Sequence, residues 1–515
     1  MVKRAISAGT LGDLKDVELL QNLALGFSTV FVLDRLLACF MGVLIGTLIG
    51  VLPGIGPAAA ISLLLPSTFH LDPTSGIIML AGIYYGAMYG GSTTSILVNI
   101  PGEAASVVTC LDGYQMARQG RAGPALGISA MGSFIAGTLS VLGLMLVAPP
   151  LARFALSFGP PEYFSLIFCG LAILIYLASG SILKAVIMAL AGLFLGMVGT
   201  DLITGNLRFT FGNITLMDGI GMVPVVMGLF GIAEVLDNLE KSIKERTIFQ
   251  ASLANLLPDR RDWGRSIGPI LRGSIVGFFL GILPGGGAII SSFTSYALEK
   301  RISRHPEEFG RGAIEGVAGP ESANNAASSG AFIPLLTLGI PANVVMAIVL
   351  GALLTHGIQP GPLLLVRNAD LFWGVVTSMY IGNAMLLVLN LPLIGLWVRL
   401  LKIPYAILFP LILLFCLIGA YSVNNNSEEI MIMILFGAFG YLIRKFEFEA
   451  APLIFALVLS PLFENALRQS LLMSSGSFAI FFTRPISLIF MIIGIGLFIL
   501  PVLPFVKRRV MKDEL

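Results

Sequence analysis

The stretch GTLIGVLPGIGPAAAISLLLP, residues 46–66, decides the fold, because its interrupted apolar core occurs twice in the chain. The second copy, GFFLGILPGGGAIISS, spans residues 277–292. In each copy proline and glycine break an apolar run, which indicates a helix that ends inside a hydrophobic segment. The two copies match at a constant offset of 231 residues. The matched positions are Gly46, Gly50, Pro53, Gly54 and Gly56 in the first copy and Gly277, Gly281, Pro284, Gly285 and Gly287 in the second.

A second match follows the first in the same order. The run GGSTTSILVNIPGEA begins at Gly90 and the run GAFIPLLTLGIPANV begins at Gly330, and their Ile-Pro pairs, at Pro101 and Pro341, align at an offset of 240 residues. Two ordered matches at nearly equal offset indicate two structural repeats. Interrupted hydrophobic segments at corresponding places in two halves mark the binding site of a secondary transporter. We expect the repeats to be inverted, since inversion places the two hairpins on opposite faces of the membrane.

Composition places the chain in a membrane. Of its 515 residues, 56% are hydrophobic and 12% are charged, whereas soluble domains carry about 25% charged residues. Such a chain needs lipid as the solvent for much of its surface. We expect an all-α polytopic membrane protein with broken helices, re-entrant hairpins and roughly ten to twelve membrane elements. Apolar segments long enough to span lie near 36–52, 74–98, 125–148, 162–180, 182–199, 219–236, 371–396, 404–421, 428–443 and 485–506.

The charged and reactive residues exclude several classes of protein. The formal net charge is +2, and no basic block suits a nucleic acid. The four cysteines and three histidines have no metal-ligand spacing, so we expect no metal site and no bound cofactor. The phosphate-binding pattern GxxxxGKS/T does not occur. Transport energy would therefore come from an ion gradient or from a separate subunit.

Positive charge orients the chain. Residues 240–266 and 299–311 carry several lysines and arginines, so we place both stretches in the cytoplasm and residues 200–218 in the periplasm. Residues 267–298 then begin and end on the cytoplasmic side, although two crossings need about 40 residues. We expect this segment to enter the membrane, turn at Pro284-Gly285-Gly286-Gly287 and leave again. The chain divides into a first membrane half at 1–239, a cytoplasmic loop at 240–266, and a second membrane half with C-terminal helices at 267–515.

Three clusters of small polar residues lie beside the matched helix breaks. Hydroxyl and amide oxygens, together with carbonyls freed at a break, suit a hard cation such as Na⁺. Half-helix N-termini at the same breaks suit an anionic group. The alternative is that these residues only allow close helix packing. The candidate substrate- and ion-binding residues are Ser92, Thr93, Thr94, Asn99, Ser322, Asn324, Asn325, Ser328, Ser329 and Thr337.

Two acidic residues lie next to these clusters. Glu103 follows the first Ile-Pro pair, and Glu321 precedes the second cluster. An ionisable side chain within a membrane segment indicates function, although a glutamate at a helix start also interacts favourably with the helix dipole. We keep both as candidate proton carriers. The candidate hairpin tips and helix breaks are Pro53, Gly54, Gly56, Pro101, Pro284, Gly285, Gly287 and Pro341.

Three runs together resemble the large membrane subunit of the tripartite tricarboxylate transporter family. They are residues 46–66, the run GIYYGAMYGGSTTSILVNIPGEAASVVTCLDGYQMARQGRAGPALGI at 82–128, and the run GPESANNAASSGAFIPLLTLGIPAN at 319–343. The likeness covers nearly the whole chain. The resemblance implies a permease of the bacterial inner membrane that works with a small membrane subunit and a periplasmic solute-binding protein. It also implies import of citrate-like carboxylates in symport with cations, usually Na⁺.

The residues themselves leave three alternatives open. The first is a carrier of another small organic acid coupled to protons. The second is a channel, which would also suit paired broken hairpins but needs no periplasmic receptor. The third is an intramembrane hydrolase, which would need a base beside its nucleophile. No histidine or Asp/Lys pair lies near Ser92 or Ser328, so we expect no enzymatic activity.

Overall fold

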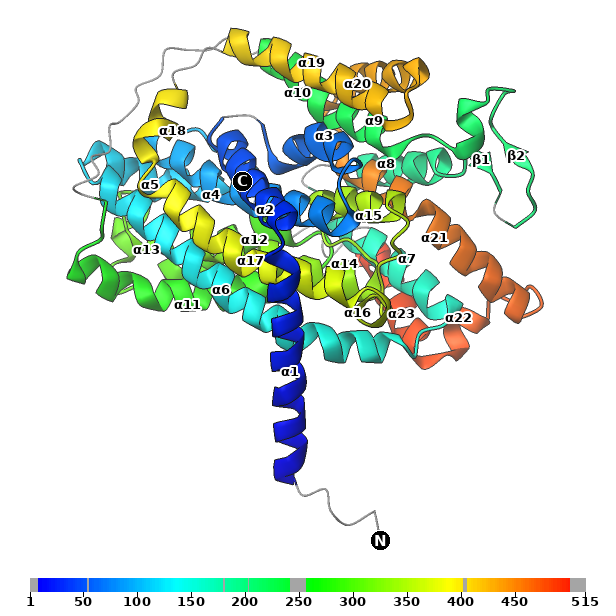
Figure 1. Ribbon diagram of the computed structural model, residues 1–515, viewed down its shortest axis with the longest axis horizontal. Coiled ribbons are helices and arrows are strands. Elements are labelled where there is room, and N and C mark those ends of the chain that lie inside the picture. Colours follow the sequence, from blue (N-terminus) through cyan, green and yellow to red (C-terminus); the bar gives the residue numbers. More distant parts are fainter. Residues whose placement is uncertain are drawn as a thin grey trace.

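The structure, a computed structural model, is a body built almost entirely of helices, from which helix α1 projects (Figure 1). In the part of the chain that is described, the sheet consists of two antiparallel two-residue strands, β1 (Gly199–Thr200) and β2 (Leu207–Arg208). Seven of the described helices are long and apolar enough to cross a membrane. The prediction of an all-α polytopic membrane protein is confirmed. The described residues are 8–52, 55–178, 181–201, 203–240, 256–401 and 405–500.

The helices follow one another along the two halves of the chain. The first half contains α1 (Ala8–Val30), α2 (Leu33–Val51), α3 (Pro57–Thr68), α4 (Pro73–Val98), η1 (Ala104–Ser106), α5 (Val107–Arg118), α6 (Ala122–Ala155), α7 (Pro160–Tyr176), α8 (Ile182–Leu195), η2 (Thr215–Asp218), α9 (Met222–Val226), η3 (Met227–Ile232) and α10 (Ala233–Glu240). The second half contains α11 (Arg260–Ile282), α12 (Gly287–Ile302), η5 (Pro306–Glu308), α13 (Glu315–Gly330), α14 (Phe332–Leu338), α15 (Val344–Thr355), α16 (Leu364–Arg367), α17 (Ala369–Asn390), α18 (Ile394–Leu400), α19 (Tyr405–Asn424), α20 (Ser427–Lys445), α21 (Ala451–Met473), α22 (Ile480–Thr483) and α23 (Pro485–Ile499).

Helices α4 and α13 form the centre of the molecule. Every residue from Thr74 to Val98 in α4 and from Gly316 to Gly330 in α13 is buried. Helix α4 packs against α2, and α13 packs against α11 and α6. Both central helices are rich in glycine, alanine and serine, and such small residues let helix backbones approach closely.

The helix pairs α2–α4 and α11–α13 pack in the same way. A Cβ atom added at Gly46 would lie 2.5 Å from the carbonyl oxygen of Ile83, and one added at Gly277 would lie 2.1 Å from that of Ala323. These glycines are equivalent by the offset of 231 residues, and the residues they contact by the offset of 240. Glycine is needed at both places because the backbones touch. The same correspondence links Gly42–Met79 with Gly273–Gly319, and Gly50–Ala87 with Gly281–Ala327.

The helix that follows each hairpin also ends at an equivalent residue. Asn99, with φ of 60°, ends α4, and Gly339, with φ of 72°, ends α14. Each interruption is followed by a residue whose side chain caps the next helix, Glu103 in the first half and Asn343 in the second. These two caps are again 240 residues apart. The structure places Pro101 and Pro341 inside the two interruptions.

Helix α4 and the α13–α14 segment cross in antiparallel directions. The ring centroids of Tyr84 and Phe332 are 6.4 Å apart, and two turns further along α4 the Ser92 hydroxyl donates to Glu321. Residue numbers therefore rise along α4 as they fall along its partner. Antiparallel crossing of equivalent helices is the arrangement that inverted repeats produce. The orientation of the two repeats in a bilayer stays a prediction.

The segment predicted to turn back is a helical hairpin. Residues 283–286 join α11 to α12, and Arg272 of α11 donates to both carboxylate oxygens of Glu299 in α12, at 2.8 and 2.6 Å. Helix α11 begins inside the stretch predicted as a loop, because the Asp259 carboxylate caps it by accepting from the backbone N–H of Asp262 at 2.7 Å. The turn falls at the predicted residues, and its depth in the membrane stays a prediction.

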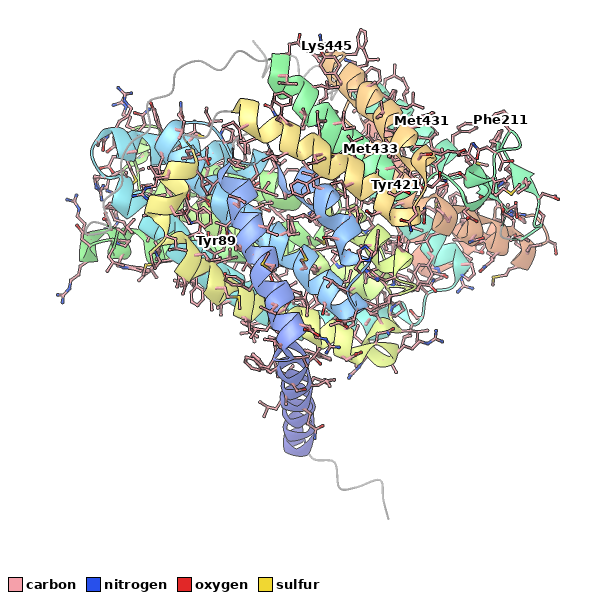
Figure 2. The ribbon with its side chains drawn as sticks, turned by 45° about the horizontal axis from the view of Figure 1, so that its top comes forward. Tyr89, Phe211, Tyr421, Met431, Met433 and Lys445 are labelled. Atoms are coloured by element: carbon pink, nitrogen blue, oxygen red, sulfur yellow. The ribbon has the colours of Figure 1, made fainter. Side chains whose placement is uncertain are left out.

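Cysteine labelling tests whether the α11–α12 hairpin returns to the side on which it enters. Single cysteines at Arg261 and Arg301, both exposed, should react with an impermeant maleimide from the same face in a variant without native cysteines. Phe211 is 91% exposed on the loop predicted to be periplasmic and provides the opposite-face control (Figure 2). Reaction of the first two sites from opposite faces would contradict the hairpin.

The two stretches that charge places in the cytoplasm contact each other, since Arg265 donates to Glu308 at 2.5 Å. The Gln119 amide donates to the carbonyl of Arg311 at 2.7 Å, and Arg121 pairs with Asp262. Residues 241–255 of the predicted cytoplasmic loop lie outside the described residues. Around the predicted periplasmic loop, the contacts are Asn213 with Glu428, Asn426 with Thr215, and Arg468 with Asp201.

Helix α21 is long and apolar enough to span the membrane. It was not among the spans expected from the sequence, because its polar residues interrupt the apolar run. Arg208 on β2 donates to both carboxylate oxygens of Glu464 in α21, at 2.7 and 3.1 Å. Arg468 of α21 donates to Asp201 at 2.7 Å. The backbone N–H of Thr204 and the Arg468 guanidinium hold the pKa of Asp201 well below its usual range. This network ties the β1–β2 loop to the end of α21.

Candidate transport site

The polar residues of the central helices gather around one buried carboxylate, Glu321 of α13. Its oxygens accept hydrogen bonds from the hydroxyls of Ser92 in α4 and Thr109 in α5. The Asn324 amide donates to the same carboxylate at 3.4 Å. Glu321 is fully buried, and none of the described ion pairs includes it. A buried carboxylate that is met only by hydroxyls and an amide can take up a proton or a small cation.

A layer of amides lies one turn further along α13. The Asn325 amide donates to the Ser133 hydroxyl of α6 at 2.8 Å and to the Asn324 side-chain oxygen at 2.6 Å. The Ser322 hydroxyl is buried and has no hydrogen-bond partner among the described residues. This layer thus extends the cluster from α13 toward α6. Two further serines donate to backbone carbonyls of their own helix, Ser328 and Ser329.

The serine and threonine run of α4 does not converge on one ligand. Ser92 reaches the buried carboxylate, and Thr93 borders a void of about 10 Å³, which is about the size of one water molecule. Thr94 donates to the last carbonyl of α2 at 2.6 Å, and Ser95 donates to a hydroxyl of η1 at 2.9 Å. Consecutive helical residues point in different directions, since each step turns by about 100°. The run therefore divides between the carboxylate cluster and the packing of α4 against its neighbours.

Two predicted residues lie apart from the cluster. Asn99 is exposed and ends α4 in a left-handed conformation. Thr337 is buried in α14 and donates to the carbonyl of Ile333 in its own helix at 2.6 Å. The structure does not bring either side chain to Glu321.

A cavity of about 300 Å³ lies between the two halves of the chain. Its wall includes the first residue of each of four helices, Pro57 of α3, Gly287 of α12, Val344 of α15 and Ala451 of α21, together with Ala104, where η1 leads into α5. Helix starts present free N–H groups and a partial positive charge, which favour an anion. The volume is at the lower end of the range for small-molecule sites. We call this space the inner cavity.

Four polar side chains border the inner cavity, Tyr84, Glu103, Asn343 and Glu449. The Asn343 amide donates to the Tyr84 hydroxyl at 3.0 Å. One carboxylate oxygen of Glu103 accepts from the N–H of Ala105 at 2.5 Å, and the other is buried without a partner among the described residues. A buried carboxylate oxygen that no protein group pairs is suited to accept a proton, a water molecule or a small cation. The inner cavity therefore offers one place for a cation, at Glu103, and another for an anionic group, at the helix starts.

The tip of the α11–α12 hairpin forms part of the cavity wall. Gly285, with φ of 78°, donates its N–H to the carbonyl of Ala342 at 2.8 Å, and Gly287, with φ of 48°, begins α12. Glycine tolerates this left-handed backbone at no steric cost. The hairpin tip of one repeat unit is thus hydrogen-bonded to the helix break that follows it. In the first half Gly56 caps α3 in an extended conformation, and Pro53 and Gly54 lie outside the described residues.

Sequence reasoning missed three residues of this region. Thr109 and Ser133 lie on α5 and α6 without any motif of their own, so only the packing of α13 identifies them. Asn343 had a signal, because the offset of 240 residues aligns it with Glu103. The repeat alignment could therefore have identified both caps of the inner cavity.

A multi-pass helical protein whose helices break in pairs around a cavity between its two halves has the architecture of a secondary transporter. Comparison with known proteins makes this class specific. Residues 36–455 match the tripartite tricarboxylate transporter TctA family, and the chain belongs to that family. The resemblance found in the sequence is confirmed.

Two relatives come from Agrobacterium vitis. The chain is 52% identical over 493 residues to a protein described as an uncharacterized 52.8 kDa protein in the TAR-I ttuC' 3'region, covering 96% of this chain and 98% of that protein. It is 51% identical over 233 residues to an uncharacterized protein in the TAR-II ttuC' 3'region, covering 45% of this chain and 96% of that protein. No solved structure matches the chain.

Proposed function

We propose that this protein is the large permease subunit of a binding-protein-dependent secondary transporter that imports a tricarboxylate or a related carboxylate. The observation that carries the proposal is the inner cavity, because helix starts from both halves of the chain line it. A site between two repeats can open to each face of the membrane in turn. Membership of the family supports tricarboxylates as the substrate class.

The charge balance of the inner cavity supports coupling to a cation. An anionic substrate loses its water there, and this loss is costly unless its charge is met. Each helix start supplies only about half a charge, whereas Glu103 and Glu449 add two carboxylates, and no lysine or arginine lines the cavity. A co-transported cation therefore completes the site. Na⁺ is the first candidate, because carboxylate, hydroxyl and amide oxygens at Glu103 and around Glu321 suit a hard cation.

A proton is the second candidate for the coupling ion. Its support is the complete burial of Glu321 without a cationic partner in the described part of the chain. The proposed assembly also includes a small membrane subunit and a periplasmic solute-binding protein in a bacterial inner membrane.

Uptake into liposomes that hold both membrane subunits tests the proposal. With the loaded binding protein and Na⁺ outside, labelled citrate should accumulate and its uptake should saturate. Replacing Na⁺ by choline at constant pH should lower uptake about tenfold or more, since the substrate charge is then uncompensated.

Three outcomes separate the alternatives. Uptake that survives without Na⁺ but stops when the pH gradient is collapsed would assign coupling to protons. Accumulation that needs neither gradient would contradict cation coupling altogether. Flux that does not saturate and does not need the binding protein would indicate a channel and overturn the permease.

A further inference from the structure

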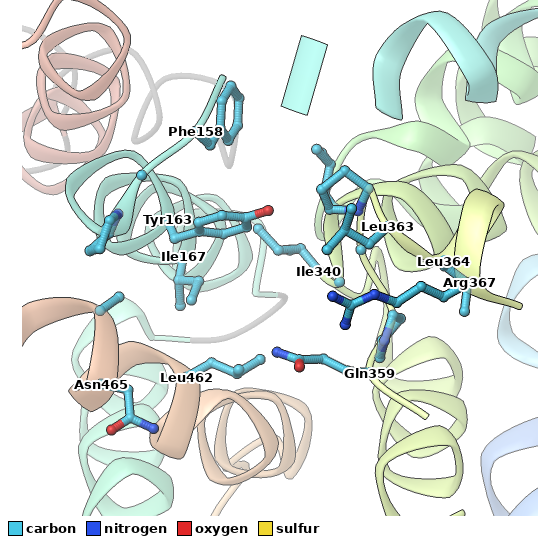
Figure 3. Close-up of a pocket in the computed structure, with 18 of the residues that line it drawn as sticks. Phe158, Tyr163, Ile167, Ile340, Gln359, Leu363, Leu364, Arg367, Leu462 and Asn465 are labelled. Carbon is cyan, nitrogen blue, oxygen red and sulfur yellow. The ribbon is translucent and has the colours of Figure 1, made fainter. Parts of the chain in front are cut away.

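A second and larger cavity, of about 700 Å³, lies beside the inner cavity. Its walls come from the start of α7, the segment that contains α16, and α21 (Figure 3). We call it the α7–α21 vestibule. Its bordering side chains include Tyr163, Ile167, Gln359, Arg367, Leu462 and Asn465.

The vestibule carries one uncompensated positive charge. Arg367 is the charged side chain among the residues that line it, and no acidic side chain lines it. Figure 3 shows the guanidinium extending from one wall toward Gln359 and the middle of the cavity, with Tyr163 on the α7 wall. Arg367 is exposed, and no ion pair or hydrogen bond of its guanidinium occurs among the described residues, whereas the half-buried Arg265 and Arg272 are both paired. Guanidinium is the group that binds carboxylates in a forked, bidentate manner.

The neighbouring polar groups suit the same ligand. The amides of Gln359, Asn368, Asn465 and Gln469 line the vestibule, and neutral amides donate hydrogen bonds to a carboxylate without neutralising Arg367. The remaining wall is largely apolar. A small organic anion with one or more carboxylates matches this arrangement better than a cation, which the arginine would repel.

The vestibule and the inner cavity meet at the second helix break. Gly339 and Ile340 line the vestibule, while Asn343 and Val344, on the other side of the break, line the inner cavity. Helix α7 borders both spaces. A Cβ atom added at Gly170 of α7 would lie 3.8 Å from Ile340 and 4.0 Å from Pro284. A thin layer, made by the break, the hairpin tip and α7, therefore separates the two spaces.

The vestibule lies at the end of α21 that contacts the predicted periplasmic loop. Asn465 and Gln469 line it, and Arg468, on the same turn, pairs with Asp201 of that loop. A substrate released by a periplasmic binding protein would therefore reach the vestibule before the inner cavity.

We propose that the α7–α21 vestibule is a separate entry site that captures the carboxylate substrate through Arg367 before the substrate passes the second helix break. This inference rests on the proposed import of a carboxylate. It assigns substrate capture to a residue outside the inner cavity and outside the polar clusters of α4 and α13. Arg367 sets the affinity for substrate and takes no part in cation coupling.

The test compares Arg367→Gln and Arg367→Lys with the wild type in lipid nanodiscs that hold both membrane subunits and no binding protein. Labelled citrate, succinate and acetate are titrated in parallel. Arg367→Gln should weaken binding of every carboxylate that the wild type binds by about tenfold, since it removes the charge partner. Arg367→Lys should weaken binding less, because it keeps the positive charge and loses only the paired hydrogen bonds that a guanidinium makes to a carboxylate. Arg301→Gln, which removes an exposed charge outside both cavities, should leave binding unchanged.

Uptake by the complete assembly gives an independent measure. Arg367→Gln should raise the KM for substrate while the maximal rate and the Na⁺ dependence stay as in the wild type. Unchanged affinity and KM in this variant would overturn the vestibule and leave the proposed permease intact. If Arg367→Gln binds citrate normally but binds the solute-binding protein more weakly, Arg367 would serve in docking of that protein, and the proposed capture of substrate would be overturned. A wild type that binds none of the three acids, or that binds them without transporting them, would overturn the permease and with it the entry site.

Discussion

Replacement of Glu321 by glutamine is expected to abolish cation-coupled uptake while the protein still folds. Glutamine keeps the size of the side chain and still meets a hydroxyl of Ser92 or Thr109, but it supplies no charge. A bound cation would lose a buried charge partner, which costs about 3 kcal/mol, or roughly a hundredfold in affinity. Uptake at graded Na⁺ and pH, together with size-exclusion chromatography of the purified protein, measures this effect.

Glu299→Gln is the matched control for that substitution. Glu299 is only 2% exposed, but Arg272 neutralises it. We expect its loss to lower stability without changing the Na⁺ or pH dependence of uptake. Wild-type coupling in Glu321→Gln would show that the carboxylate only packs α13 against α4 and α5.

The two hydroxyls that donate to Glu321 provide a second test of the same cluster. Ser92→Ala combined with Thr109→Ala leaves the carboxylate oxygens without their donors, at about 1–3 kcal/mol for each buried group. Uptake should fall with the apparent cation affinity. Thr47→Ala combined with Ser274→Ala removes two buried hydroxyls that bond only to carbonyls of their own helices, and uptake should stay normal.

The largest effect on folding is expected for Gly277→Ala. The added methyl group would lie 2.1 Å from the carbonyl oxygen of Ala323 in α13, a contact that only a shift of one helix backbone can relieve. Overpacking of this kind costs about 1–3 kcal/mol, and loss of the α11–α13 contact also displaces Glu321. We expect little monodisperse protein in detergent and a lower unfolding temperature.

Gly264→Ala provides the control on the same helix. Gly264 is exposed and has no atom within 4 Å of an added Cβ atom, so alanine should be tolerated and should slightly favour the helix. Gly46→Ala should behave like Gly277→Ala, because its Cβ atom would lie 2.5 Å from the Ile83 carbonyl oxygen. Normal folding of Gly277→Ala would contradict backbone contact at this position.

The sequence alone determined the features that depend on a single segment. Low charge and long apolar runs determined a helical membrane protein, because a helix pairs all of its backbone hydrogen-bonding groups within one segment, as lipid requires. Proline and glycine determined the turn at Pro284–Gly287 and the interruptions at Pro101 and Pro341, since these residues act on their own backbone. The repeat offset of 240 residues also aligns Asn343 with Glu103, so the sequence contains the position of both caps. The sequence did not predict α21 as a span, because Glu464 and Arg468 lower its hydropathy and the partners of these two residues lie far away in sequence.

Only the tertiary structure decided which polar groups meet. Ser92 to Ser95 look equivalent in the sequence, but their directions around α4 send Ser92 to Glu321 and Thr94 to the end of α2. Thr109 joins the carboxylate only because α5 packs beside α13. The inner cavity and the vestibule exist only where several helices leave space between them. Helix starts and stops follow from local backbone chemistry, whereas the facing of side chains follows from how helices distant in sequence cross, and no local pattern contains that geometry.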